Sequence, residues 1–164
     1  MKITCIGGGA WGTTLAQVLS DNGHEVLIRD VNKDFINKIN NEHLHPFFDV
    51  TIPTNIKATY DLQEALNFSN IIVLCVPTKF MRSVLAEVNQ LIKEPKLFVN
   101  VSKGIEIETS YCVSQIVEEV IEKNKFKAYV DLSGPSHAEE LILRKLTALV
   151  AASKNQDSAK LVQQ

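Results

Sequence analysis

Apolar residues recur along the chain in short blocks that alternate with stretches of helical periodicity. The clearest block, residues 70–76, is apolar on both faces, which is typical of a central strand in a parallel sheet. The predicted strands cover residues 3–6, 25–28, 56–59, 70–76, 97–101, 128–132 and 147–152. The predicted helices cover residues 11–22, 32–41, 62–67, 78–92, 109–123 and 137–144, with a last one beginning near residue 156. This order predicts an α/β fold with a doubly wound, mostly parallel sheet and helices on both faces.

Local signals mark where several of these elements begin and end. Gly23 is suited to close the first helix, Asp61 to cap the third and Thr109 to cap the fifth. Residues 43–55 follow neither period, so we expect a surface loop folded over a cleft. His43 and His45 in this loop are expected at the surface, and without a third ligand they predict no metal site.

The turn between the first strand and the first helix carries the most informative motif. Its glycines follow the spacing Gly7-x-Gly9-x-x-Gly12. In such a unit the first glycine allows a tight turn, the second lets backbone approach a pyrophosphate, and the third lets helix and strand pack closely. The helix then directs free N–H groups and the positive end of its dipole at the phosphates. The motif predicts a Rossmann-like dinucleotide-binding turn, with an ordinary glycine-rich loop as the alternative.

Asp30 ends the second strand and is the candidate for the cofactor's ribose. A carboxylate there can accept hydrogen bonds from the ribose hydroxyls of NAD and would repel the 2′-phosphate of NADP. Arg29 beside it keeps NADP open, because an Arg in this region can accommodate that phosphate. The other interpretation of Asp30 is a solvated residue that caps the next helix.

Further candidates also follow strands, where ligands gather in folds of this class. The ammonium of Lys103 can hold a phosphate or polarise a carbonyl oxygen, whereas a Lys in a turn is commonly just solvated. Gly134 and Ser136 can offer N–H groups and a hydroxyl to an anion, with a plain turn and helix cap as the alternative. His137 is interpreted as a helix-start residue rather than a catalytic one.

Composition and charge narrow the class of protein. The 164 residues suit one domain, 45% of them are hydrophobic, and the formal net charge is −2. Without a basic surplus or a long apolar run, the sequence predicts no nucleic-acid partner and no membrane insertion. The three cysteines, Cys5, Cys75 and Cys112, lack metal-ligand spacing, and the apolar strand-like runs around Cys5 and Cys75 indicate small core residues in a reducing cytoplasm.

Four blocks of sequence, spread over nearly the whole chain, carry a resemblance to a known family. They read GGGAWGTTLA at 7–16, VPTKFMR at 76–82, SKGIE at 102–106 and LSGPSHAEE at 132–140. In this order they resemble the N-terminal half of bacterial NAD(P)-dependent glycerol-3-phosphate dehydrogenase. Members of that family continue into an α-helical domain about as long again. We therefore expect residues 1–164 to be the dinucleotide-binding domain, truncated within its last helix.

The resemblance implies roles for individual residues. Those implied to contact the cofactor are Gly7, Gly9, Ala10, Trp11, Gly12, Val31, Asn32, Phe47 and Ala138. Lys103 would stand between nicotinamide and substrate, with Gly134 and Ser136 on the glycerol phosphate. Val31 takes a position that is often basic in the family, which favours NAD over NADP. The family's general acid/base Lys and a phosphate-gripping Arg belong to the helical half.

The function implied is reversible hydride transfer between NAD(P) and sn-glycerol 3-phosphate, which gives dihydroxyacetone phosphate and feeds glycerophospholipid synthesis. The resemblance also implies a cytoplasmic enzyme that is a homodimer at full length, and a piece of this size alone is expected to be inactive. One alternative is the cofactor domain of another phospho- or hydroxyacid dehydrogenase of the same two-domain plan. The other is a non-catalytic nucleotide-sensing module, since fold does not fix function.

Overall fold

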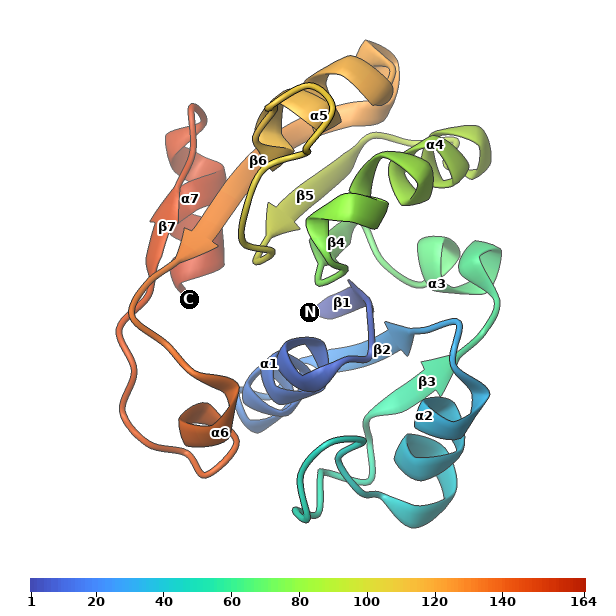
Figure 1. The fold of residues 1–164 in the computed structure, drawn as a ribbon, viewed down its shortest axis with the longest axis vertical. Coiled ribbons are helices and arrows are strands. Elements are labelled where there is room, and N and C mark those ends of the chain that lie inside the picture. Colours follow the sequence, from blue (N-terminus) through green and yellow to red (C-terminus); the bar gives the residue numbers. More distant parts are fainter.

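The computed structural model describes residues 1–164 and is built on one seven-stranded sheet (Figure 1). The strand order is β3-β2-β1-β4-β5-β6-β7. The strands are β1 Lys2–Ile6, β2 Glu25–Arg29, β3 Lys57–Thr59, β4 Ile71–Leu74, β5 Lys96–Asn100, β6 Phe126–Ser133 and β7 Val150–Ala152. Strands β1 to β6 run parallel and β7 pairs antiparallel with β6. The predicted doubly wound, mostly parallel sheet is confirmed, and its order reverses between β1 and β4.

Helices cover both faces of this sheet. They are α1 Ala10–Asp21, α2 Lys33–Asn37, α3 Leu62–Phe68, α4 Met81–Leu91, α5 Val113–Val120, α6 Ala138–Leu141 and α7 Gln156–Gln163. Helices α1, α6 and α7 contribute to the apolar core on one face, and α3, α4 and α5 to the core on the other (Figure 1). None of the helices combines the length and apolar character needed to cross a bilayer.

The period of two along each strand explains why there are two cores. In β1, Ile3 and Cys5 face the α1 side while Ile6 faces the α3 side, because successive side chains point to opposite faces. In the neighbouring strand β4, Ile72 and Leu74 join Ile6 in the second core. A strand buried on both faces loses little by being apolar throughout, as the sequence of β4 is.

Several predicted elements differ from the observed ones; the helix expected over 137–144, for example, is limited to α6, and the strand expected over 70–76 to β4. The helix expected over 109–123 begins only at Val113 and ends at Val120, with Cys112 at its N-cap. The hydroxyl of Thr109, the expected cap, donates instead to the Glu106 carboxylate. The helix expected over 32–41 is split into α2 and a π-helical turn, Lys38–Glu42. The strand expected over 147–152 begins only at Val150, and the residues directly before it form a loop.

The expectation that His45 lies at the surface is wrong. Its side chain is 2% exposed. The ring Nε2 is 3.1 Å from the Ala10 carbonyl oxygen and 3.2 Å from the Thr14 hydroxyl, while Nδ1 accepts from the amides of Phe47 and Phe48. The irregular loop 43–55 is thus fastened to the start of α1 by a buried imidazole.

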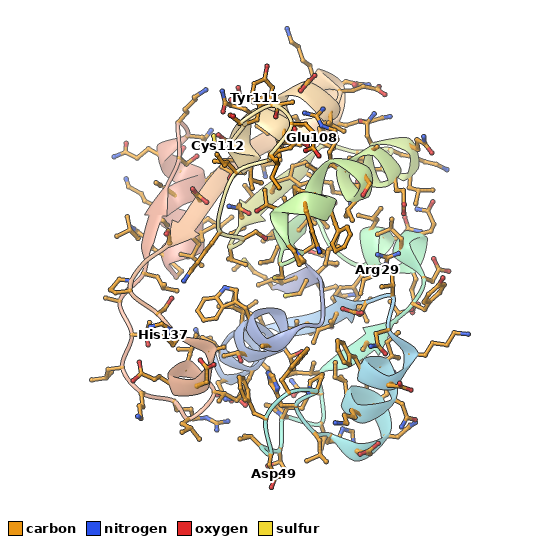
Figure 2. All side chains as sticks on the ribbon, viewed as in Figure 1. Arg29, Asp49, Glu108, Tyr111, Cys112 and His137 are labelled. Carbon is orange, nitrogen blue, oxygen red and sulfur yellow. The ribbon has the colours of Figure 1, made fainter.

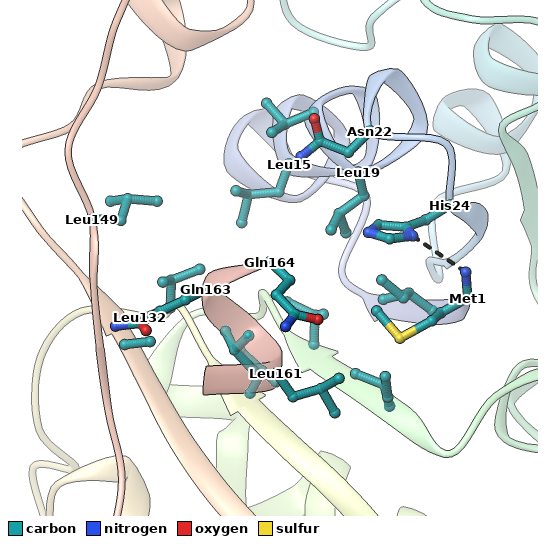
Figure 3. A pocket seen from close by; sticks show the side chains of 17 residues that line it. Met1, Leu15, Leu19, Asn22, His24, Leu132, Leu149, Leu161, Gln163 and Gln164 are labelled. Atoms are coloured by element: carbon teal, nitrogen blue, oxygen red, sulfur yellow. Dashed lines mark hydrogen bonds between the residues drawn. The ribbon is translucent and has the colours of Figure 1, made fainter. Parts of the chain in front are cut away.

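An apolar hollow of about 270 Å³ lies between α1, α7 and the sheet (Figure 3). Leu15 and Leu19 of α1 line one side and Leu161 of α7 the other. At its rim the terminal amine of Met1 contacts His24 Nδ1 at 3.2 Å. Met1 and His24 precede β1 and β2, so the hollow reaches the amino ends of these two strands.

Candidate functional site

The glycine turn joins β1 to α1 at the edge where the strand order reverses. Gly7 has φ +112°, and a Cβ on it would stand 2.8 Å from the Cys75 carbonyl oxygen of the chain after β4. A Cβ on Gly12 would run into the Gly7 carbonyl oxygen. Both glycines are therefore required by the fold itself, through a tight turn and close helix–strand packing.

Gly9 differs from these two glycines. It is the N-cap of α1 with φ −69° and ψ −172°, an extended conformation open to any residue. Nothing lies within 4 Å of the position that its Cβ would occupy. The fold leaves this space open, and Gly9 lines a groove at the helix N-terminus.

That groove, of about 400 Å³, lies over the carboxyl ends of β1, β4 and β5. Beyond Gly9 it is lined by Ala10, Trp11, Cys75, Val76, Pro77, Val101, Ser102, Lys103, Ser136, His137 and Ala138. The first turn of α1 directs its free N–H groups into it, as an anion site requires. Trp11 Nε1 is buried and has no hydrogen-bond partner in the chain, so a donor is left over for a ligand.

Asp30 lies directly beside the glycine turn. One carboxylate oxygen accepts the Gly8 amide at 2.5 Å and the other accepts the Asn32 amide at 2.8 Å. Each oxygen of a carboxylate can accept more than one hydrogen bond, so capacity for ribose hydroxyls remains. Arg29, at the end of β2 (Figure 2), has a buried Nε with no partner in the chain.

Val31, Asn32 and Phe47 lie outside the residues that line the groove. Val31 and Phe47 are 63% and 55% exposed. The Phe47 ring packs edge-on against Phe35, with centroids 5.0 Å apart. The Asn32 side chain caps α2 by accepting the Asp34 amide at 2.9 Å.

Lys103 follows β5 in a turn held by hydroxyl groups. The Ser102 hydroxyl contacts the carbonyl oxygens of Leu74 and Val76, at 3.1 and 2.7 Å, and the Thr78 hydroxyl donates to the Lys103 carbonyl at 2.8 Å. The Lys103 ammonium lies 3.5 Å from the Ser136 carbonyl oxygen. The turn thus brings a cation to the groove that begins at Gly9.

A second, more polar pocket of about 260 Å³ adjoins the groove at Lys103. Gly134 and Ser136 line it, and a Cβ on Gly134 would collide with the Ala148 carbonyl oxygen. Ser136 is buried, and its hydroxyl lies 3.4 Å from the Gly134 carbonyl oxygen. His137 is the N-cap of α6 but makes no side-chain capping bond, and it is exposed (Figure 2).

Several lining residues of this pocket were missed from the sequence. Asn100 Nδ2 donates to Asp131 Oδ1 at 2.8 Å, and the Tyr129 hydroxyl is 3.5 Å from the same oxygen. Burial, followed by the charge of Asp131, raises the pKa of Tyr129 well above its usual range. A usable signal existed, since Asn100 and Asp131 are polar residues near the carboxyl ends of apolar strands. Cys112, the N-cap of α5 (Figure 2), also lines the pocket.

The Cys112 thiol is the one cysteine of the chain that lies at the surface. A hydrogen bond with the Ser114 hydroxyl is the main cause of a lowered pKa for this thiol. No three His, Cys, Asp or Glu side chains are grouped so that they could hold a metal ion.

The parallel sheet, the glycine turn and the groove along the N-terminus of α1 define the class of Rossmann-type dinucleotide-binding domains. More particularly, the chain belongs to the family described as NAD-dependent glycerol-3-phosphate dehydrogenase N-terminus, whose model matches residues 2–159. The family resemblance carried by the four sequence blocks is thereby confirmed.

Curated relatives carry the same name. The chain is 56% identical over 164 residues to glycerol-3-phosphate dehydrogenase [NAD(P)+] of Acholeplasma laidlawii, covering 100% of this chain and 49% of the relative. It is 55% identical over 153 residues to the protein of that name from Phytoplasma mali, covering 93% and 46%. The chain therefore spans about half the length of the relatives it matches.

Solved structures agree on the fold. The crystal structure of glycerol-3-phosphate dehydrogenase from Coxiella burnetii matches with a TM-score of 0.88 and 26% identity, over 98% of this chain and 49% of that one. A GDP-mannose dehydrogenase from Pseudomonas aeruginosa matches with a TM-score of 0.77 at 20% identity, over 99% of this chain and 43% of that one. At that identity the second likeness concerns the fold alone.

Proposed function

We propose that this chain is the cofactor-binding part of an NAD(P)-dependent oxidoreductase that interconverts sn-glycerol 3-phosphate and dihydroxyacetone phosphate. The observation that carries the proposal is the groove that runs from the open space at Gly9 to the ammonium of Lys103. The unpartnered Trp11 Nε1 within that groove supports a polar ligand. The names of the relatives supply the reaction.

The residues present fit a dinucleotide cofactor. The N–H groups at the start of α1 would hold the pyrophosphate next to Gly9, and Asp30 would accept from the adenosine ribose. Bound in this way, the nicotinamide supplies the chemistry by accepting or giving a hydride at C4. Of the residues implied to contact the cofactor, Ala10, Trp11 and Ala138 line the groove, as does Lys103, which is implied to stand beside the nicotinamide.

The chain's own contribution to the substrate lies around Lys103. Its ammonium would hold the oxygen at the reacting carbon or a phosphate, and stabilise negative charge that develops there. Gly134 and Ser136 line the adjoining pocket and would contact the glycerol phosphate. On the resemblance we further propose a cytoplasmic, homodimeric full-length enzyme that feeds glycerophospholipid synthesis, with no nucleic-acid or membrane partner.

We propose NAD rather than NADP as the preferred cofactor, because a buried 2′-phosphate would meet the Asp30 carboxylate. Like charges placed side by side at an interface cost several kcal/mol. The residue directly after Asp30 is not basic: it is Val31, which is exposed and uncharged. Arg29 is the residue that could offset this preference by pairing with the phosphate.

The test is a titration of this chain with NADH and with NADPH, followed by calorimetry and by the emission of Trp11, its only tryptophan. We expect both to report binding, with NADH the tighter ligand and Trp11 emission quenched. Absence of any heat of binding up to millimolar NADH would overturn the proposed function. Tighter binding of NADPH would overturn only the role given to Asp30, and Asp30→Asn, which removes the charge, is the matched variant for that point.

A further inference from the structure

The loop that carries Lys103 joins β5 to α5, and almost no apolar contact holds it down. Ile105 and Ile107 are 58% and 84% exposed. Between residues 102 and 112 the only buried side chain is that of Glu106, a residue 6% exposed. A buried carboxylate is costly unless it is paired and hydrogen-bonded, so the partners of Glu106 determine how this loop lies.

The main partner is Arg82 in the first turn of α4. Arg82 Nε donates to Glu106 Oε1 and Arg82 Nη2 to Glu106 Oε2, both at 2.8 Å, which is the planar bidentate pairing that guanidinium groups favour. The Thr109 hydroxyl donates to the same carboxylate at 2.5 Å. The bonds from Arg82 and then Thr109 lower the pKa of Glu106 to about 2, so the carboxylate is charged at neutral pH.

Glu106 also closes the loop through its backbone. Its amide donates to the Tyr111 carbonyl oxygen and its own carbonyl accepts the Ser110 amide, both at 2.8 Å. On the other side of Lys103, the Thr78 hydroxyl donates to the Lys103 carbonyl. Thr78 and Arg82 both belong to the segment that follows β4, so this segment holds the Lys103 loop at two points.

We propose that Arg82 and Glu106 are positioning residues, whose bidentate pair fixes where the Lys103 ammonium stands in the groove and thereby sets cofactor affinity. This inference rests on the proposed function, because it assumes that Lys103 lies beside a bound nicotinamide cofactor. A merely structural pair would change the stability of the fold and leave the affinity of the folded protein unaltered.

Arg82 offers a matched control. Its Nη2 also donates to Glu119 Oε2 on α5 at 2.9 Å, and the Glu119 side chain is 54% exposed. Like Glu106→Gln, Glu119→Gln removes one negative charge that pairs with the Arg82 guanidinium. Unlike Glu106→Gln, it leaves the bonds between Arg82 and the Lys103 loop in place. A second loop variant, Arg82→Gln, releases Glu106 from the side of α4.

The experiment measures amide hydrogen exchange over residues 103–111 and NADH affinity by calorimetry, well below the melting temperature. Glu106→Gln and Arg82→Gln should speed exchange in this loop and weaken NADH binding roughly five- to tenfold, as expected for coupled neighbouring residues. Glu119→Gln should change neither. In a Lys103→Ala background, Glu106→Gln should lose its effect on NADH affinity, because the residue through which it acts is gone.

The outcomes separate this inference from the proposed function. Absence of NADH binding by the unsubstituted chain overturns both. Normal NADH binding that Glu106→Gln leaves unchanged, with only a lower melting temperature, overturns the positioning role alone. The positioning role is likewise overturned if the effects of Glu106→Gln and Lys103→Ala on NADH affinity simply add.

Discussion

At the residue scale, the glycines of one motif divide into those that the fold needs and one that it does not. Gly7 and Gly12 have no room for a Cβ against the Cys75 and Gly7 carbonyl oxygens. Gly9 has both the room and a backbone conformation that any residue adopts. Because the fold does not require glycine at position 9, a substitution of Gly9 can test the proposed ligand site without harming the fold.

Gly9→Val should abolish NADH binding while the melting temperature changes by no more than a few degrees. The side chain would enter open groove where the pyrophosphate is proposed to lie, and its Cβ would have no protein atom within 4 Å. Gly12→Ala is the contrasting variant: its Cβ meets the Gly7 carbonyl oxygen, so it should destabilise the fold. Calorimetric titration and thermal unfolding of both variants provide the check, and full NADH affinity in Gly9→Val would contradict a pyrophosphate at this position.

At the element scale, loop 43–55 depends on one buried imidazole. Since His45 Nδ1 accepts two amides, Nε2 carries the proton toward the Ala10 carbonyl oxygen. Burial lowers the pKa of His45 from 6.5 to about 4, with the Ala10 hydrogen bond acting in the opposite direction. A protonated ring would lose its acceptor for both amides, so the loop requires neutral His45.

The free energy of unfolding should therefore fall as pH drops from about 6.5 toward 4. In this window the unfolded chain takes up a proton on His45 that the folded chain does not, a linkage worth up to about 3 kcal/mol. Above pH 7 the contribution is fully present. His45→Asn, which keeps an acceptor near the Nδ1 position, serves as the control because it cannot titrate. The difference in unfolding free energy between the unsubstituted chain and His45→Asn, measured across this pH range, isolates His45 from the carboxylates. Identical pH dependence of the two proteins would refute the role given to neutral His45.

Loop 43–55 and the loop between β5 and α5 show where prediction from sequence reaches its limit. Strand and helix periods predict β1, β4 and α1 because burial dictates those patterns directly. The burial of His45 and of Glu106 could not be predicted, since polar side chains in loops give no period and their partners lie in other elements. The start of α5 was misplaced for a related reason: Thr109 resembles a cap in sequence, whereas its hydroxyl serves the Glu106 carboxylate.

At the scale of the whole molecule, the doubly wound sheet gathers the candidate residues at one edge. The groove at Gly9 and the polar pocket at Gly134 meet at Lys103, although these residues are far apart in the sequence. That convergence follows from topology, because parallel strands all end at the same edge and the order reverses between β1 and β4. The apolar hollow of Figure 3 lies between α1, α7 and the sheet, reaches the amino ends of β1 and β2, and is lined mostly by apolar side chains.

Residues 1–164 by themselves should bind NADH but should not oxidise it with dihydroxyacetone phosphate. Reduction of the ketone needs a proton donor as well as a hydride, and the resemblance assigns that donor to the half of the relatives that this chain does not match. Two groups that line the polar pocket do not replace this donor. Burial raises the pKa of Tyr129, which makes it a weak acid, and the Asp131 carboxylate accepts a hydrogen bond from Asn100. Positioned proton transfer typically contributes about 10²–10⁴-fold to such reactions.

The measurement is NADH oxidation by the pure chain with dihydroxyacetone phosphate or ketopantoate, and NAD+ reduction with 6-phosphogluconate, as alternative substrates. We expect no turnover with any of them, against the ~1 s⁻¹ or more of ordinary enzymes. Lys103→Ala is the control for trace activity, because a residual rate that it leaves unchanged comes from a contaminant. Steady turnover near ~1 s⁻¹ that Lys103→Ala removes would show that residues 1–164 hold the complete catalytic apparatus, contrary to the proposal.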